Sequence, residues 1–465
     1  MKRLVIVGLW LVSSAAMGAS PYAEQAPERL AQYIRVDTTN PPGNESAGVE
    51  FLAGILDSAG IPYETAESGP GRGNLWTRLK GGSEPALVLL HHIDVVSADP
   101  RYWQVDPLAG EIRDGYVWGR GALDMKGTAI SQLQAFLALH GSGKRLNRDV
   151  LLVATADEEA GGHYGAGWLI EHRPEIFEGV GYLLNEGGGG VLIDGRVMFT
   201  VEVTQKVPVW LRATARGNPG HGSTPQTATA VTRLLRAGDR LANTAFPPRL
   251  IEPVEQMFEA MAPFVQEELR SRFANVRASI QDPDFLRYLQ LVNPPAHALL
   301  RNTCSITRLQ GSDKINVVPT EAVMELDCRL LPDQDHDAFV SDLATIINDP
   351  QVTLETLMAF TPAVTRTDTP LYELIEEIAA KRRPDAAVVP GVSTGFTDSH
   401  FFRDLGISSY GFSPTVIPEA DRSGVHGNNE RVSVQHLVEG TEFLIELVSR
   451  FTASDRADRV SSTSE

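Results

Sequence analysis

Histidine and carboxylate side chains follow three short apolar segments between residues 86 and 186. The apolar segments are ALVLL, LLVATA and VGYLL, and the residues that follow them are His91, His92, Asp94, Asp157, Glu158, Glu159, Asn185 and Glu186. A further acid, Asp124, lies between the first two groups in the glycine-bracketed stretch WGRGALDMKG. Imidazoles and carboxylates bind divalent metals, and several carboxylates can share a dry crevice only when cations or protons offset their charge. The pattern therefore favours a metal site over a structural polar network.

The three apolar segments have the composition of buried strands. A short, β-branched run that ends abruptly at acids and histidines is typical of a parallel strand, and open α/β sheets hold ligands at the carboxyl ends of such strands. Residues 149–156 are predicted to be a strand that follows an amphipathic helix over residues 127–139, and with ALVLL they form one βαβ unit. The loop from Ser97 to Asp114 is expected to lie over the strand ends and shape the site.

Strand geometry suggests different roles for neighbouring residues. His92 and Asp94 point to one side of an extended chain and His91 to the other. This predicts that His92 binds metal, that Asp94 fixes its second ring nitrogen and that His91 is structural. Glu158 and Glu159 also point opposite ways if their strand continues, so one could bind metal while the other acts as a base toward bound water.

The character of the chain changes near Val207. The elements expected next are a strand, a helix and two more strands, at residues 207–217, 228–242, 302–310 and 321–331. This order predicts a small split-βαβ domain over residues 207–331, inserted between two parts of a catalytic domain, residues 20–206 and 332–453. The helical section over residues 247–295 is expected to elaborate the inserted domain.

Length, charge and the two ends of the chain narrow the class of protein. The 465 residues exceed what one hydrophobic core normally serves, which agrees with two domains. With 41 Lys and Arg against 59 Asp and Glu, the formal net charge of -18 disfavours nucleic acid and anionic membranes as partners. Residues 1–19, with a basic start and an apolar stretch, are predicted to be a cleaved export signal. The mature chain is then periplasmic or secreted without a membrane span, and residues 454–465 are expected to be disordered.

The only two cysteines, Cys304 and Cys328, are too few for a thiolate zinc site, so any metal must use histidine and carboxylate ligands. They lie at equal offsets from the connection centred near Asn316, which makes them candidates for facing positions of an antiparallel hairpin. In an exported protein they could form a disulfide. A register slip of one residue would place them on opposite faces, so the sequence leaves the bond open.

The order of these motifs resembles that of a known family. HxD, GRGxxDMKG, EE, a further acid and a late histidine follow one another as in the zinc-dependent metallopeptidases that include aminoacylases, glutamate carboxypeptidases and succinyl-diaminopimelate desuccinylase. The resemblance covers nearly the whole mature chain. It implies an α/β fold, with a di-zinc aminopeptidase-like catalytic domain of mixed sheet and flanking helices. It also implies that the inserted domain is a ferredoxin-like α+β lid and dimerisation domain.

The resemblance further implies a binuclear metal site. Two divalent ions are implied, most readily zinc, although carboxylate and imidazole ligands also accept cobalt or manganese. The implied ligands are His92, Asp124 and Glu186 for one ion and Glu159 and His426 for the other, with Asp124 as the bridge. Glu158 would be the general base and Asp94 the partner of His92. His426 lies in the turn SGVHGNNE and would by itself be interpreted as a surface histidine.

The resemblance also implies roles for three residues of the inserted domain. Asn302 and Arg329 would contact substrate, and the planar fork of Arg329 suits a free α-carboxylate; an exposed strand arginine is the alternative. His221 in GNPGHGSTP would reach the site of the other subunit in a homodimer formed through residues 207–331, and stabilise charge on the scissile oxygen. The alternative for His221 is a turn residue that caps the helix beginning near Thr227.

These assignments predict an exported metal-dependent amidohydrolase that cleaves a peptide or N-acyl amide bond next to a C-terminal amino acid with a free carboxylate. A di-zinc aminopeptidase is one alternative, and would recognise a free amine through acids rather than through Arg329. A metal-retaining binding protein without turnover is another, but the base Glu158 is present. The chain departs from the family pattern at Ser97, where proline is frequent, and in the glycine-rich stretch NEGGGG, which is expected to change the pocket.

Overall fold

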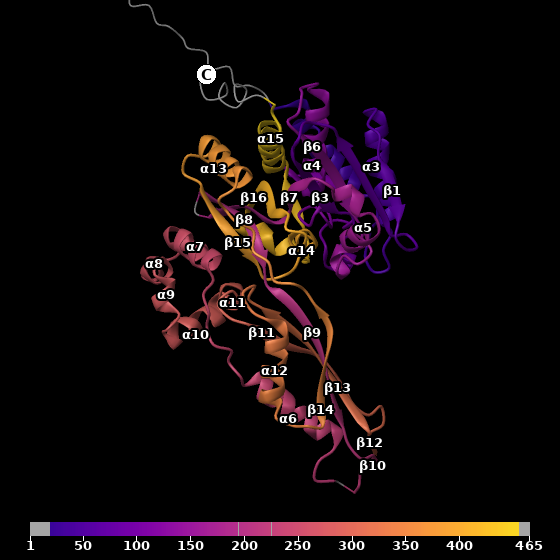
Figure 1. Ribbon diagram of the computed structural model, residues 1–465, viewed down its shortest axis with the longest axis vertical. Coiled ribbons are helices and arrows are strands. Elements are labelled where there is room, and N and C mark those ends of the chain that lie inside the picture. The colour runs from indigo at the N-terminus through magenta and orange to yellow at the C-terminus, as the bar shows by residue number, and fades with distance from the viewer. Residues whose placement is uncertain (1–18, 194, 225, 455–465) are drawn as a thin grey trace, which may run out of the picture.

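The computed structural model describes residues 19–193, 195–224 and 226–454, which form two connected units. A wide α/β unit surrounds an eight-stranded sheet, and a narrower unit with a four-stranded sheet projects from it (Figure 1). The predicted export signal and the predicted disordered tail lie outside the described residues, except for residues 19 and 454 at their inner ends. Within the described ranges, no helix combines the length and apolar character needed to cross a membrane.

The eight-stranded sheet is mixed and places the predicted ligand-bearing strands side by side. In spatial order its strands are β1 (Glu64–Glu67), β2 (Gly73–Leu79), β6 (Arg148–Thr155), β3 (Glu84–His92), β7 (Val180–Ile193), β16 (Ser408–Pro418), β8 (Arg196–Gln205) and β15 (Ala387–Ser393). β3 is parallel to both β6 and β7, whereas β2 is antiparallel to β6. The carboxyl ends of β3 and β6 therefore meet, as predicted. β7 does not end at Asn185 as expected, because it continues through the glycine run to Ile193.

Helices cover both faces of this sheet, which explains the uninterrupted apolar run of β3. Leu87 and Leu89 belong to a core that includes residues of α2 (Ala26–Ile34), α3 (Glu45–Ser58), α4 (Lys126–Gly141), α13 (Pro370–Arg382) and α15 (Val434–Phe451). Val88 and Leu90 belong to a core on α5 (Ala166–His172) and α14 (Ser399–Asp404). The helix predicted over residues 127–139 is α4. It is not amphipathic, because α2 and α15 cover its outer side and nearly all its side chains are buried.

The narrower unit has the order of a ferredoxin-like fold. Along the chain its elements are β9 (Val207–Arg216), α6 (Ala230–Ala242), β11 (Thr303–Gln310), β13 (Glu321–Leu330), α12 (His336–Ile347) and β14 (Val352–Ala359), and its sheet order is β11-β13-β9-β14 with antiparallel pairing throughout. A short ribbon of β10 (Gly220–His221) and β12 (Val317–Val318) lies at its far end (Figure 1). The predicted boundary at residue 331 is too early, since β14 pairs with β9 and extends this unit to Ala359.

The helical section between α6 and β11 has a core of its own. It contains α7 (Glu252–Met261), α8 (Glu267–Ala274), α9 (Val276–Ser279), α10 (Pro283–Val292) and α11 (Pro294–Ala298). Val392 of β15 belongs to the same apolar cluster, and α7 packs on β15 at the edge of the large sheet. This section thus lies within the inserted domain in the chain, between α6 and β11, and packs on the edge of the catalytic unit.

Cys304 and Cys328 lie directly opposite each other on β11 and β13 and form a disulfide, with their Cα atoms 4.0 Å apart. Thiol titration of denatured, unreduced protein is therefore expected to detect no free thiol. Because the bond closes a loop of 24 residues in sequence separation, its removal in the double variant Cys304→Ala, Cys328→Ala should lower the free energy of unfolding by about 3 kcal/mol. Two free thiols per chain in the unreduced protein would contradict the bond.

Candidate metal centre

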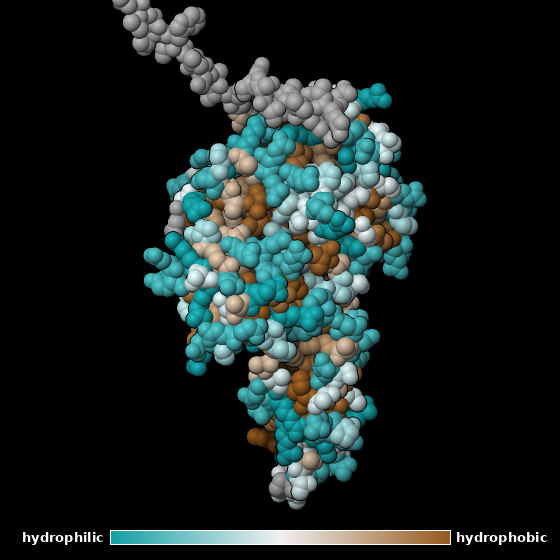
Figure 2. Space-filling model, turned by 60° about the vertical axis from the view of Figure 1, so that its left-hand side comes forward, coloured by the Kyte–Doolittle hydropathy of each residue, from teal (hydrophilic) through white to brown (hydrophobic). Residues whose placement is uncertain are grey.

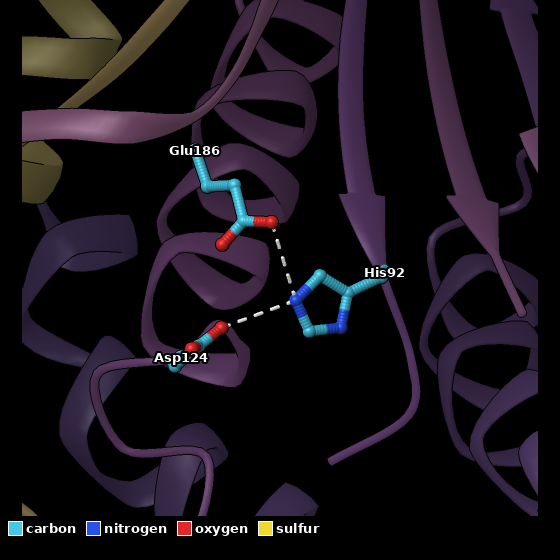
Figure 3. A group of neighbouring side chains, drawn as sticks. All are labelled: His92, Asp124 and Glu186. Atoms are coloured by element: carbon cyan, nitrogen blue, oxygen red, sulfur yellow. Dashed lines mark hydrogen bonds and ion pairs between the residues drawn. The ribbon is translucent and has the colours of Figure 1, made fainter. Parts of the chain in front are cut away.

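Three predicted ligands converge where β3, β7 and the loop before α4 meet (Figure 3). His92 is the last residue of β3, and its Nε2 lies 3.2 Å from Asp124 Oδ1 and 3.4 Å from Glu186 Oε1. The ligand atoms of this first triad all lie within 4.8 Å of one another. One imidazole and two carboxylates around a common point can hold a divalent cation.

A second triad shares Asp124 with the first. His426 Nε2 lies 3.1 Å from Asp124 Oδ2 and 3.1 Å from Glu159 Oε2. The two oxygens of Asp124 thus face two different histidines, which is the arrangement of a carboxylate that bridges two metal positions. The structure brings all five predicted ligands together, including His426 from a loop near the C-terminal end of the described chain.

Glu158 and Glu159 lie in a turn and not on a continuing strand. β6 ends at Thr155, and Asp157 adopts a left-handed backbone with φ of 69° that turns the chain into the short 3-10 helix Glu158–Ala160. The expectation that strand alternation separates the two glutamates is therefore wrong. Their side chains nevertheless differ in place, since Glu159 contacts His426 while Glu158 Oε2 lies 4.0 Å from His92 Nε2 and belongs to neither triad.

Asp94 supports the site differently from the expectation. His92 Nδ1 lies 2.9 Å from the backbone carbonyl of Asp94 and 3.6 Å from its carboxylate Oδ1, so the carbonyl is the nearer acceptor for the ring proton. The carboxylate of Asp94 instead accepts the backbone N–H groups of Glu158 and Glu159, each at 3.1 Å, and Asn40 Nδ2 at 2.8 Å. Asp94 therefore fixes the turn that carries both glutamates.

The clustered carboxylates of the centre need added positive charge to offset their repulsion. Burial raises the pKa of Glu186 to about 7, and burial together with the charge of Glu186 raises the pKa of Glu158 well above its usual range. Hydrogen bonds with Asp124 and Glu159 raise the pKa of His426 to about 10. The site thus takes up protons that cations could replace. Glu159 Oε1 is buried and has no hydrogen-bond partner among the described residues, so the donor set fits a pair of divalent metals.

A cleft of about 660 Å³ opens over both triads and joins the two units. Its lining includes Asp124, Glu158, Glu186 and His426 from the catalytic unit and Arg329 from the narrower unit. Arg329 Nε donates to Asp327 Oδ1 at 2.7 Å, whereas its Nη1 is buried and, within the described chain, unpartnered. Its Nη2 donates to Asp327 Oδ2 at 3.2 Å, so Asp327 holds the guanidinium in the lining of the same cleft as the metal ligands.

Asn302 and His221 lie outside this cleft of their own chain. Asn302 Oδ1 accepts the backbone N–H of Leu331 at 2.9 Å, so its oxygen holds the end of β13. His221 lies on β10, exposed, at the far end of the narrower unit, with its Nδ1 2.7 Å from Ser223 Oγ. His221 begins a turn, since its carbonyl accepts the N–H of Thr224 at 3.0 Å, but it does not cap α6, whose N-cap is Thr229.

The glycines after Glu186 are explained by backbone packing. Gly187, Gly188, Gly189 and Gly190 line the cleft. A Cβ at Gly188 would lie 2.3 Å from the carbonyl oxygen of Thr200 and 2.4 Å from that of Gly411, so β7 passes too close to β8 and β16 for any side chain. The glycine run therefore changes the pocket by lining part of the cleft with backbone atoms alone.

Sequence reasoning missed two buried acids beside the centre. Asp398, in the stretch DSHFF, accepts Thr155 Oγ1 at 3.0 Å, and burial raises its pKa to about 7. Glu430, four residues after His426, accepts the backbone N–H groups of Leu123 and Asp124. Neither acid follows a strand of the predicted site, and only the folded arrangement reveals its partners.

A paired-triad centre beside a buried glutamate is the arrangement of a binuclear metallohydrolase. The sequence matches the model of Peptidase family M20/M25/M40 over residues 88–450, and the chain belongs to this family. The family resemblance, the fold class and the enzyme class predicted from the motifs are therefore confirmed.

The chain is similar in sequence to several named relatives and similar in fold to several solved structures. The N-fatty-acyl-amino acid synthase/hydrolase PM20D1 of Xenopus tropicalis is 33% identical over 370 residues, which are 78% of this chain and 71% of the relative. Aminoacylase-1A of Rattus norvegicus is 28% identical over 429 residues, 90% of this chain and 93% of the relative. The M20 family metallo-carboxypeptidase Sso-CP2 from Sulfolobus solfataricus has the same fold, with a TM-score of 0.69 and 19% identity over 91% of this chain and 98% of that chain.

Proposed function

We propose that this protein hydrolyses the amide bond of N-acyl amino acids or small peptides next to a C-terminal amino acid with a free α-carboxylate. The observation that carries the proposal is the position of Arg329, a cation from the narrower unit, in the lining of the cleft that holds both triads. A guanidinium suits a carboxylate because it is always charged and donates charge-assisted hydrogen bonds from several N–H groups. The names of the relatives support this choice, since they include an aminoacylase, a carboxypeptidase S-like protein and hydrolases of N-fatty-acyl amino acids.

The catalytic roles follow from the positions of the side chains. Two divalent ions, zinc in this proposal, would be held by His92, Asp124 and Glu186 and by Asp124, Glu159 and His426, and would supply Lewis acidity toward the scissile carbonyl and lower the pKa of a water. Glu158 takes a proton from the attacking water and returns it to the leaving amine. Arg329 holds the substrate carboxylate and thereby orients the amide bond.

A hydrolysis screen tests the proposal. Metal-loaded protein is given N-acyl amino acids, dipeptides and amino-acid anilides, and product release is measured. Hydrolysis of the first two classes is expected. Cleavage of anilides alone would favour an aminopeptidase, and no turnover with two metals bound would favour a binding protein.

Replacement of Arg329 by methionine is expected to lower kcat/KM about 10- to 100-fold, because a hydrogen-bonded charge pair with the substrate is lost. The loss should appear mainly in KM, since the carboxylate is bound in both ground and transition states. A substrate with a carboxamide in place of the carboxylate should be hydrolysed equally by both proteins. Arg212→Met is the matched control, because Arg212 lies on the same sheet and pairs with Glu325 at 2.8 Å outside the cleft. An equal loss in the control would contradict the role of Arg329.

We propose in addition that the protein is a homodimer through the narrower unit. β11 is an edge strand of the four-stranded sheet. It carries Ile306 and Leu309, which are 41% and 58% exposed, and Leu235 on neighbouring α6 is 53% exposed. Figure 2 shows hydrophobic patches, in brown, on the surface of this unit. A second copy of the chain is a suitable partner, since a two-fold axis would pair the same edge with itself.

In such a dimer His221 would act in the active site of the other subunit. Glu158→Gln and His221→Ala subunits are each expected to be inactive, and their mixture to regain activity because every heterodimer contains one site with both residues intact. Activity and subunit exchange are measured on the same mixture. Activity that stays at the level of the parents after verified exchange would rule out action across the interface.

Export of the mature chain is also part of the proposal. The basic and apolar start over residues 1–19 supports it, and so does the Cys304–Cys328 disulfide, because such bonds persist in oxidising compartments outside the cytosol. Fractionation of producing cells, with the mass of the mature chain, tests a periplasmic or secreted location.

A further inference from the structure

A buried ion pair, Arg120 with Glu430, connects the two loops that carry Asp124 and His426. Arg120 Nη1 lies 2.7 Å from Glu430 Oε2, and the two side chains are only 3% and 0% exposed. Both residues lie outside the two triads. A buried charged pair stabilises a fold little more than well-packed apolar residues of similar volume would. Stability alone therefore does not explain why this pair lies between the two loops.

Glu430 holds the backbone on the Asp124 side. Its Oε1 accepts the N–H groups of Leu123 at 2.7 Å and Asp124 at 3.1 Å, and its Oε2 accepts the N–H of Gly121 at 3.0 Å. Three backbone donors within four residues of the loop thus converge on one carboxylate. This fixes the backbone from which the bridging side chain of Asp124 projects.

Arg120 holds the backbone on the His426 side. Its Nη2 donates to the carbonyl of Gly427 at 2.8 Å and its Nη1 to that of Gly424 at 3.4 Å. Its own loop is joined to the same segment by the Gly119 N–H, which donates to the carbonyl of Glu430 at 3.0 Å. The guanidinium therefore spans both sides of His426 in the sequence.

The two triads depend on this connection to different degrees. His92 and Glu186 lie on β3 and β7, which pair in parallel within the central sheet. His426 lies in an exposed loop with a left-handed backbone, φ 55°, and no strand holds it. The second triad therefore depends on the positions of both loops, because each carries one of its ligands. In the first triad only Asp124 lies in a loop of this kind.

We propose that Arg120 and Glu430 are positioning residues that set the geometry of the second metal position. This inference rests on the proposed binuclear function. Residues behind metal ligands typically change metal affinity 10- to 100-fold when they are replaced. In Glu430→Gln the amide can accept only through its oxygen, so part of the backbone donors lose their acceptor and Arg120 loses its counter-charge.

Zinc binding to the metal-free protein tests the inference, by equilibrium dialysis with the metal measured directly. The wild type is expected to bind two equivalents. Glu430→Gln should bind the second equivalent about 10- to 100-fold more weakly, and the first with a smaller loss of affinity, because only Asp124 of the first triad depends on this loop. Arg120→Lys, which keeps the charge but loses the contacts with Gly424 and Gly427, should weaken the same equivalent, and excess zinc should restore turnover in both.

Glu202→Gln is the matched control. Glu202 pairs with Arg403 in the same unit, and these side chains are also 3% and 0% exposed. The control should lose comparable stability, measured by thermal unfolding, and keep both equivalents. Unchanged second-site affinity in Glu430→Gln and Arg120→Lys, or equal loss of both equivalents, overturns the inference alone. Fewer than two equivalents in the wild type overturns the proposed binuclear function and this inference with it.

Discussion

Glu158→Gln is expected to lower kcat by about 10²- to 10⁴-fold while both metal triads remain able to bind, because the change removes a proton acceptor and no ligand. Glu158 Oε2 lies 4.0 Å from His92 Nε2 and outside both triads. The backbone N–H of Glu158, which donates to Asp94, is unaffected by the substitution. Turnover of an N-acyl amino acid and bound metal are measured on the same preparation.

The design separates loss of the base from loss of the fold. Glutamine has nearly the shape of glutamate, and Glu178→Gln, at an exposed position away from the centre, controls for the loss of one charge. The control should keep wild-type turnover. If Glu158→Gln kept its turnover, or if it lost its metals, the assignment of Glu158 as the base would fail.

The part of the site on strands could be predicted because parallel strands impose their own order. His92 ends β3, and the Glu158 turn follows the neighbouring β6, so the rule about carboxyl ends of strands was sufficient to bring them together. His426 had no such local signal. Its position depends on contacts between distant loops, among them the pairing of β17 (Arg431–Ser433) with β5 (Tyr116–Trp118), and it was predicted only through the family resemblance.

Roles within the site were harder to predict than its members. Strand alternation separates Glu158 from Glu159 only where the chain is extended, whereas Asp157 turns it, and aspartate is among the residues that tolerate a left-handed backbone. That turn also gives the carboxylate of Asp94 its actual partners. The left-handed backbone at Asp157 thus changes the roles inferred for Asp94, Glu158 and Glu159. All three acids still lie at the centre.

The boundary of the narrower unit depended on pairing between distant segments. β14 follows α12 and pairs with β9, which lies more than one hundred residues earlier in the chain. Residues 352–359 were expected in the second part of the catalytic domain, because the sequence of a strand does not indicate which sheet it joins. α4 was misjudged for the same reason, because the helix that covers its outer side, α15, comes from the other end of the chain.

Asp124→Ala is expected to abolish tight binding of both metals, because Asp124 is the only residue that belongs to both triads. Its two oxygens face His92 Nε2 at 3.2 Å and His426 Nε2 at 3.1 Å, so one substitution removes a ligand from each position. Burial alone would raise the pKa of Asp124, but its hydrogen bonds with the two histidines lower it, so the residue is an anion at neutral pH. An anionic bridge is what two neighbouring cations require to offset their repulsion.

The comparison variant is His426→Ala, which removes a ligand from the second triad only and should therefore lose one equivalent of metal. Metal that binds the folded state raises its stability, by about 2.7 kcal/mol per site at a free concentration one hundred times Kd. Added zinc should then raise the melting temperature of the wild type most, of His426→Ala less, and of Asp124→Ala hardly at all. Two equivalents of tightly bound zinc in Asp124→Ala would show that Asp124 is not the bridge, and that the two triads are held apart by other residues.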